Sequence, residues 1–454
     1  MTKAKTKQRG LMTLGGIVFA LTFAHAQTLA AGASDPGVRA GTPAAGGPIE
    51  GLQGYENDYF DLGRDDFTEI DGVGEGLGPR FNLDSCSGCH SQPDVGGTAP
   101  DVNPQVAVAT AFGARNTPPS FITANGPVRE ARFKFKADGT RDGGVHALFV
   151  VSGRVDESGD ASGCNITQED FAGQLRRNNV VFRIPTPTFG AGLVEQISEN
   201  AIVTNLAAFA GAKSRLGIGG HLNRSGNDGT VTRFGWKAQN KSLMIFSGEA
   251  YNVEMGITNE AFQNERDETR SCLTASHPNS TTNLAGATGA ETESAIGKFS
   301  MFMRFLAPPA RSTTTPGGSA SVSRGKLLFA ATGCAYCHSP TLKTSVSAVE
   351  ALSEKNVDLF SDLAVHRMGP RLADNVQQGS AAGDEFRTAP LWGLGQRIFF
   401  LHDGRTKDLL QAIRAHASDG NFQFGPSEAN RVIGQFNQLS EQQKQDLLNF
   451  LRSL

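Results

Sequence analysis

The sequence predicts a mainly α-helical protein with two small, similar domains and an irregular, partly β insertion between their motifs. A pentapeptide, Cys-x-x-Cys-His, occurs twice, at residues 86–90 and 334–338. Apolar residues of the C-terminal part recur at helical spacing. Short stretches of the middle section, at residues 131–135 and 146–151, have the high apolar content of strands.

The repeated pentapeptide is the attachment signature of c-type haem, so both domains are expected to be cytochrome c-like. Two thiols add across the haem vinyl groups, and the adjacent His becomes the proximal iron ligand. A zinc site is an alternative, but it needs four ligands from paired half-motifs, and both motifs here end in the same His. We expect two covalently bound haem c groups, held by Cys86, Cys89 and His90 and by Cys334, Cys337 and His338.

Residues 1–26 have the features of a cleaved secretory signal peptide. Basic residues precede an apolar stretch, Leu11–Phe23, that is too short to span a bilayer comfortably, and Ala24-His25-Ala26 follows. An uncleaved anchor is the alternative. We expect a periplasmic mature protein without a membrane span, which agrees with haem attachment outside the cytoplasm.

The remaining cysteines, Cys164 and Cys272, belong to no haem motif. In an oxidising compartment they most simply form a disulfide, and two free buried thiols are the alternative. The net charge is −3 with both signs interspersed, which argues against nucleic acid as a partner.

Composition and motif positions divide the mature chain into four parts. Residues 27–50 are rich in Gly, Ala and Pro and are expected to form a flexible arm. Residues 51–125 surround the first motif, and residues 126–315 form a middle insertion that contributes to the first haem pocket. Residues 316–454 are expected to be a compact cytochrome c-like domain, with a helix leading into the second motif and a last helix that begins with the capping box Ser440-Glu441-Gln442-Gln443.

A faint internal repeat links the two halves. The segments 182–192 and 386–395 share, with one gap, Phe-Arg, a Pro, an aromatic residue and Gly-x-Gly. A duplicated cytochrome would produce this pattern, and coincidence between two turns rich in Gly and Pro is the alternative.

Four stretches resemble the di-haem oxidoreductase family, which is related to bacterial di-haem cytochrome c peroxidases: residues 76–82, 233–238, 255–258 and 400–405. The resemblance implies peroxidase-like redox chemistry, a small periplasmic electron-transfer protein as partner, and peroxide or another small molecule as substrate. The middle section is longer than in the classical peroxidases, so their detailed activity is not transferred. Relatives hold calcium between the domains, but no ligand motif fixes one here.

His416 is the expected second ligand of the iron bound by His338. It lies fourteen residues after His402, on one helical face with Leu409 and Ile413, where the related peroxidases have a ligand Met. Two His ligands imply a lower potential than His and Met. The alternatives are Met368 as the ligand and His416 as a core or surface residue.

The repeat indicates an open first haem. An offset of 203 residues relates Pro187 to Pro390, and the same offset maps His416 onto Lys213. Neither His nor Met is present there, so we expect the His90 iron to be open on one face and reactive. Met255 is the alternative sixth ligand.

Peroxide cleavage needs a group that moves a proton between the two oxygens. Glutamate or glutamine does this in related peroxidases, so Glu195 and Gln196 are the expected catalytic residues. Trp236 is the expected electron relay between the haems, with an ordinary core Trp as the alternative. His402 is expected to hydrogen-bond a haem propionate or a carbonyl.

The expected function is that of a di-haem oxidoreductase whose C-terminal haem passes electrons to the open N-terminal haem. A di-haem electron carrier and a di-haem dioxygenase are the alternatives. The substrate, the electron donor, the direction of electron flow and the oligomeric state do not follow from the sequence.

Overall fold

The computed structural model describes residues 1–2 and 32–454. The expected signal peptide therefore lies outside the described residues, apart from its first two. The chain divides into the units Met1–Gly32 and Ala33–Leu454, and the second unit contains the fold. Within the described residues, no helix is long and apolar enough to cross a lipid bilayer.

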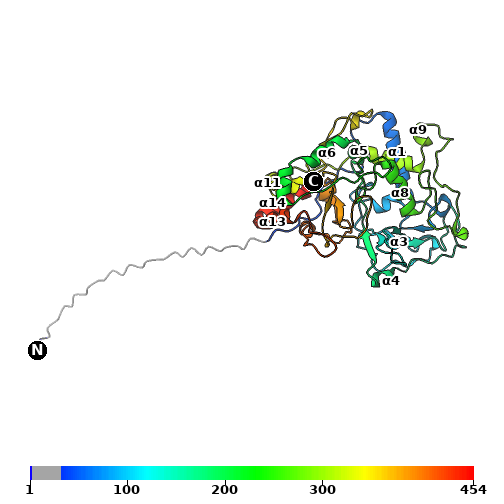
Figure 1. Cartoon of the computed structure of the whole chain (residues 1–454), viewed down its shortest axis with the longest axis horizontal. Coiled ribbons are helices and arrows are strands. Elements are labelled where there is room, and N and C mark those ends of the chain that lie inside the picture. The colour runs from blue at the N-terminus through cyan, green and yellow to red at the C-terminus, as the bar shows by residue number, and fades with distance from the viewer. Residues whose placement is uncertain (3–31) are drawn as a thin grey trace. The chain divides into compact units, whose positions relative to one another are not determined.

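Helices make up most of the regular structure of the second unit, with small antiparallel sheets between them (Figure 1). This confirms the predicted mainly α class with a partly β middle section. The α-helices are α1 (Gly54–Thr68), α2 (Cys86–Cys89), α3 (Gln105–Val108), α4 (Phe171–Arg176), α5 (Ala191–Gln196), α6 (Glu199–Ala207), α7 (Ala210–Leu216), α8 (Leu243–Met255), α9 (Gly289–Thr292), α10 (Ala295–Phe305), α11 (Ser319–Ala331), α12 (Leu409–Ala415), α13 (Asn430–Gln438) and α14 (Glu441–Ser453). Short 3-10 helices are η1 (Val73–Glu75), η2 (Ala111–Gly113), η3 (Arg270–Cys272), η4 (Cys334–Tyr336), η5 (Glu350–Leu352) and η6 (Leu394–Gln396).

The strands are short and pair in antiparallel fashion. One three-stranded sheet has the order β3-β2-β5, and the pairs β1-β4, β6-β7 and β8-β9 form two-stranded sheets. The stretches predicted as strands in the middle section contribute β2, β3 and β4. The strands are β1 (Arg80–Phe81), β2 (Glu130–Phe133), β3 (Val145–His146), β4 (Phe149–Val150), β5 (Val180–Arg183), β6 (Leu342–Lys343), β7 (Asn356–Val357), β8 (Val365–Arg367) and β9 (Glu385–Arg387).

The helix pair α11–α14 frames the second motif. The predicted capping box is present, because the Ser440 hydroxyl accepts from Gln443 N and the Gln443 side chain accepts from Ser440 N. Gly325 allows the two helices to approach closely, since a Cβ there would lie 2.0 Å from Asp446 O. Helix α11 then runs into η4, which contains the first residues of the motif. The predicted apolar face of α14 is buried, through Leu447, Leu448 and Leu451.

Two large hydrophobic clusters support the two motifs. One cluster spans α1, α8 and α10 and includes Phe67, which packs edge-on against His90 at a centroid distance of 6.0 Å. The other includes Phe329, Phe360 and Phe450, whose rings meet edge to face. Phe329 also lies 6.3 Å from the His338 ring. Each proximal His is therefore positioned against an aromatic side chain of its own core.

The internal repeat corresponds to a repeated local structure. Strands β5 and β9 end at Arg183 and Arg387, the Arg of the shared Phe-Arg pair. Gly190 and Gly393, separated by the predicted offset of 203, both have left-handed backbone, with φ of 65° and 72°. Each stands immediately before a short helix, α5 or η6. Only glycine adopts this conformation at little cost, which explains why both copies have Gly there.

The segment predicted as a flexible arm, residues 27–50, is held by hydrogen bonds over its described part. Asp35 accepts two hydrogen bonds from the Arg452 guanidinium, at 2.6 and 2.7 Å. The buried Arg39 donates to Ser453 O and Ala310 O. Ile49 N donates to Phe305 O at 2.7 Å. Residues 33–50 are extended, as a segment rich in Gly and Pro should be, but their polar groups are tied to the C-terminal helix and to α10.

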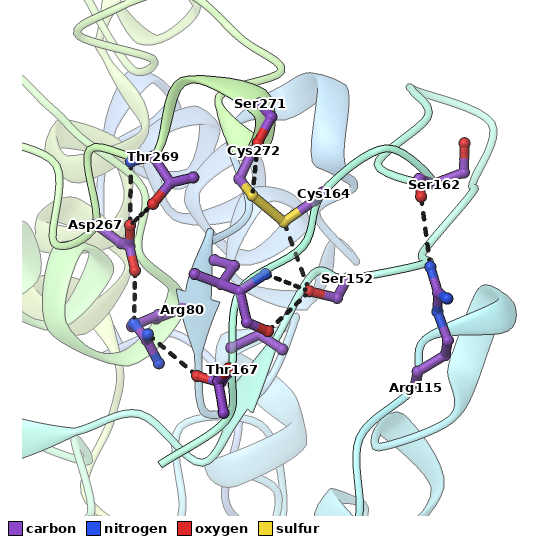
Figure 2. Close-up of a disulfide and its surroundings, with 12 residues drawn as sticks. Arg80, Arg115, Ser152, Ser162, Cys164, Thr167, Asp267, Thr269, Ser271 and Cys272 are labelled. Atoms are coloured by element: carbon purple, nitrogen blue, oxygen red, sulfur yellow. Dashed lines mark hydrogen bonds and ion pairs between the residues drawn. A yellow bond between two sulfur atoms is a disulfide. The ribbon is translucent and has the colours of Figure 1, made fainter.

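Cys164 and Cys272 form a disulfide, as the sequence suggested (Figure 2). The bond joins the loop after β4 to η3, which are 108 residues apart in the chain. Close by, Arg80 of β1 pairs with Asp267 at 2.8 Å and donates to Thr167 O. The disulfide and this ion pair link the long loop before α9 to the small β1–β4 sheet.

We predict that replacing both cysteines with Ala lowers the free energy of unfolding by about 4 kcal/mol, because the unfolded chain loses a cross-link that closes a long loop. Urea unfolding with and without a thiol reductant checks this. Reductant should destabilise the wild type and leave C164A/C272A unchanged. Equal stability of the oxidised wild type and the double variant would contradict the prediction.

Candidate functional site

Each Cys-x-x-Cys-His motif lines its own cavity. The first cavity is lined by Cys86, Cys89 and His90 and contains about 1170 Å³ of empty space, part of it open to solvent. The second cavity is lined by the residues of the second motif and contains about 1420 Å³ on the same measure. Both cavities are lined mostly by apolar surface, as a site for a large planar cofactor requires.

The first motif presents a neutral imidazole. The Nδ1 of His90 lies 2.9 Å from Gly97 O, and since a carbonyl only accepts, Nδ1 must hold the proton. The other ring nitrogen, Nε2, is then free to bind a metal. Burial lowers the pKa of His90 to about 4, so the ring is neutral at pH 7. These are the properties of a histidine that ligates iron.

The second motif repeats this arrangement and adds a second histidine. His338 Nδ1 lies 3.0 Å from Phe360 O, and His416 Nδ1 lies 2.8 Å from Ala412 O. Both residues line the second cavity. Burial and the nearby His416 lower the pKa of His338 to about 4. His416, at the end of α12, is therefore where the sequence predicted it, with Nε2 free. Met368, the alternative ligand, also lines this cavity.

Two arginines of the second cavity, the half-buried Arg387 and the buried Arg397, lack an anionic partner among the described residues. Arg387 donates Nε to Gly235 O at 2.9 Å, and neither Arg387 nor Arg397 pairs with a carboxylate of the described residues. Burial lowers the pKa of both guanidinium groups to about 10, and their mutual repulsion adds to the effect for Arg387. Unpaired buried cations need an anion. The two carboxylates of a haem would supply it, so this donor set fits the cofactor that the motif implies.

Trp236 lies between the two cavities and lines both of them. Its indole nitrogen donates to Ile184 O at 2.8 Å, which fixes the ring. The ring meets His402 edge-on at a centroid distance of 6.4 Å. His402 stacks on Phe386 at 4.3 Å and lines the second cavity, where burial lowers its pKa to about 4.

Glu195 and Gln196, the expected distal residues, do not line the first cavity. Glu195 accepts from Leu243 N at the start of α8 and pairs with Arg304 at 2.9 Å. The Gln196 carbonyl accepts from Ser345 N and Oγ. Both residues join α5 to its neighbours, so the structure places them in a supporting position.

Lys213 does not occupy a position in the first cavity equivalent to that of His416 in the second. Its buried ammonium group donates to Asn205 O and Leu206 O at the end of α6. The α6–α7 hairpin packs against the second motif instead, since Asn205 donates to Ser339 Oγ at 3.0 Å. The repeat therefore stops before α7, and the mapping of His416 onto Lys213 was wrong.

A pair of carboxyl groups in the first cavity was not predicted from the sequence. Glu130 of β2 and Glu254 of α8 both line it and hydrogen-bond to each other. Arg132 donates to Glu130 at 2.6 Å and lowers the pKa of Glu130, whereas burial and Glu130 raise the pKa of Glu254 far above its usual value. One carboxyl is therefore ionised beside one that holds its proton. The alternation of side chains along β2 places Glu130 and Arg132 on one face, and this pattern could have identified Glu130. No local sequence pattern identifies Glu254.

A charged cluster lies beside the second motif. His366 of β8 contacts Asp362 through Nε2 at 2.9 Å and Glu428 through Nδ1 at 2.8 Å. Burial lowers the pKa of His366, but the adjacent Cys337 thiol and the Asp362 carboxylate raise it well above its usual value. Cys337 Sγ lies 3.8 Å from His366 Nδ1, so the cluster borders the attachment thiol.

A family model described as "Di-haem oxidoreductase, putative peroxidase" matches residues 130–454, more than half of the chain. The match includes the second motif, and the first motif precedes it. A search of curated proteins gave no match.

Two solved structures are similar in part, each at 16% identity. One is the hydrazine synthase of Kuenenia stuttgartiensis, with a TM-score of 0.24 over 37% of this chain and 56% of that one. The chain thus spans about half the length of that protein. The other is a MauG-like protein associated with microbial copper homeostasis, with a TM-score of 0.27 over 57% of this chain and 89% of that one. Similarity at this level supports no argument about function.

We predict that Asp71→Asn removes a pH dependence of stability. Asp71 accepts a hydrogen bond at 2.9 Å from Tyr251, which lines the first cavity, and burial raises the pKa of Asp71 to about 8. The folded protein then holds a proton that the unfolded chain releases above about pH 4, so stability falls as the pH rises toward 8, by at most about 1.4 kcal/mol per pH unit. Urea unfolding from pH 5 to pH 8 should show a smaller fall for D71N.

The exposed Asp138 provides the control. Hydrogen bonds from Thr140 lower its pKa, so D138N should change the pH dependence only in acid, below this range. Parallel stability curves for D71N and the wild type between pH 5 and pH 8 would contradict the prediction.

Proposed function

Because the chain belongs to the di-haem oxidoreductase family, we propose that it is a periplasmic c-type di-haem enzyme with peroxidase-like activity. Cys86, Cys89, Cys334 and Cys337 would attach the two haems. The periplasm follows from this attachment and from the signal-like residues 1–26. When bound, the haems supply the redox chemistry, storing electrons and offering an iron on which a peroxide is reduced.

The observation behind this proposal is the unequal supply of nitrogen ligands. His338 and His416 both line the second cavity with Nε2 free. Of the histidines in the described residues, His90 alone lines the first cavity. The second iron would thus have two nitrogen ligands and the first only one, and an iron with one protein ligand can bind substrate.

Met255 is the alternative ligand for the first iron, and its contacts favour a different role. Its Sδ lies 3.9 Å from Cys86 Sγ, and the residue, at the C-terminal end of α8, is 3% exposed. A buried sulfur that contacts the attachment thiol favours a packing role for Met255, which is common for a core Met.

The carboxyl pair suits the proton transfers that peroxide reduction needs. Reduction of hydrogen peroxide to two waters consumes two protons and two electrons. The Glu254 carboxyl holds a proton that it can give to the departing oxygen, and the ionised Glu130 can accept one from the incoming peroxide. Arg132 keeps Glu130 ionised. We therefore assign to Glu254 and Glu130 the role first given to Glu195 and Gln196.

Trp236 is the aromatic group shared by the two cavities. Its position suits an electron relay from the second haem to the first, and the Ile184 carbonyl keeps the indole in place. Electrons would enter at the second haem from a small redox protein.

We predict that the oxidised holoprotein has one low-spin and one high-spin haem, measured by electron paramagnetic resonance. His416→Ala should make the second haem high-spin, because it removes one of two nitrogen ligands. Met368→Leu in the same cavity is the control and should change nothing. Purely low-spin spectra in both the oxidised and the one-electron-reduced protein would favour an electron carrier instead.

We predict that Glu254→Gln lowers kcat for hydrogen peroxide by about 10²–10⁴-fold, because the amide cannot transfer the proton. The haem spectra should be unchanged, which shows that the variant folds. Glu195→Gln is the comparison and should keep kcat close to that of the wild type. Normal turnover by E254Q would remove Glu254 from the mechanism.

A further inference from the structure

We propose that a surface beside the second motif is the docking site for an acidic, soluble redox protein. The inference deepens the proposed function, because it names the partner that delivers electrons to the second haem. The surface, called here the Phe209 surface, consists of Phe209, Arg215, Tyr336 and Arg431. We include the exposed Lys326 and Leu327 of α11, because this helix leads into the second motif.

Phe209 is an exposed aromatic residue in the turn between α6 and α7. Its side chain is 73% exposed, and its ring meets Tyr336, between the two attachment cysteines, at a centroid distance of 6.0 Å. The backbone at Phe209 has φ of 58°, a left-handed conformation that is costly for a bulky residue. Such a conformation persists only where the surroundings enforce it.

The surroundings of this turn hold it against the second motif. Lys213 ties α7 to the last carbonyls of α6, and Asn205 bonds to Ser339, one residue after His338. Phe209 is thereby fixed next to the attachment loop. Core packing does not explain an aromatic side chain in this place, because most of the ring faces solvent. Helix α11, which leads into the motif, exposes Leu327 to 72%.

The charges of this surface are of one sign. No Asp or Glu occurs from Asn200 to Asn227 or from Ser294 to Val349, although the whole chain has a net charge of −3. The exposed Arg215 and Lys326 pair with no carboxylate of the described residues. Arg431 donates to Arg215 O and adds a third cation. By contrast, Arg324 on α11 is neutralised by Asp446.

A surface with an apolar centre and a cationic border matches a partner whose apolar patch is bordered by acidic residues. Transient redox complexes bury small areas, so their association depends on electrostatic steering more than on contact area. The partner that fits is a small protein whose own redox centre lies under an apolar patch with acidic residues around it. Docking on Tyr336 would bring that centre close to the cofactor attached by Cys334 and Cys337.

The test uses the oxidised holoprotein and stopped-flow reduction by a reduced acidic cupredoxin, with a reduced basic cytochrome c as the contrasting probe. We expect the acidic donor to react faster, and its rate to fall as salt is added. The double variant R215E/K326E should slow the acidic donor by about tenfold or more and speed the basic one. Phe209→Asp should slow the acidic donor, whereas Leu284→Asp, at a side chain that is 92% exposed in the middle section, should not.

Equal rates for wild type and R215E/K326E, or a preference for the basic donor, would overturn the proposal. A change of oligomeric state in F209D, measured by sedimentation, would also overturn the proposal. It would show that a second copy of the chain covers this surface in the wild type. Peroxide turnover with a small uncharged hydroquinone separates this proposal from the proposed function. If the docking results contradict the proposal but the wild type still turns over peroxide with the hydroquinone, only the docking site is disproved. If the wild type shows no turnover with the hydroquinone, the proposed function is disproved.

Discussion

The hydrogen bond from a histidine Nδ1 to a backbone carbonyl is the constraint on which both sites depend. It occurs at His90, His338 and His416, with Gly97, Phe360 and Ala412 as acceptors. A carbonyl cannot donate, so each ring is held in one tautomer with Nε2 unprotonated and its plane fixed. Burial keeps the three rings neutral. The fold thus prepares metal ligands without relying on the metal to select their protonation state.

The two cavities differ in the charges around these ligands. The second is lined by Arg387 and Arg397, which pair with no carboxylate of the described residues, and by His366, which contacts Asp362 and Glu428. The first contains a carboxyl pair that holds a single acidic proton. The two arginines suit a cofactor that carries carboxylates. A proton that is buried next to a base suits bond cleavage. This difference in side chains supports the proposed division of labour between the two haems.

Features set by local sequence were predictable, and features set by long-range burial were not. The attachment motifs, the capping box and the helical placement of His416 depend on spacings of a few residues. The disulfide followed from having only two cysteines left over. Glu195 was a poor choice because its partner, Arg304, is far away in sequence and neutralises it. Glu254 was missed because its high pKa depends on burial beside Glu130, which no local pattern reveals.

The internal repeat gives the two sites a similar local backbone, although their side chains differ. Arg183 and Arg387 end equivalent strands, and each faces its own cavity. Arg183 is neutralised by Asp374 at 2.7 Å, whereas Arg387 has no acidic partner in the described part of the chain. The same backbone position thus became an internal ion pair in one half and a free cation in the other. The two copies differ more strongly after the shared Gly-x-Gly. The α6–α7 hairpin follows the first copy in the chain, but it packs against the second motif. No residue of this hairpin lines the first cavity, which agrees with the proposal that the first iron has an open face.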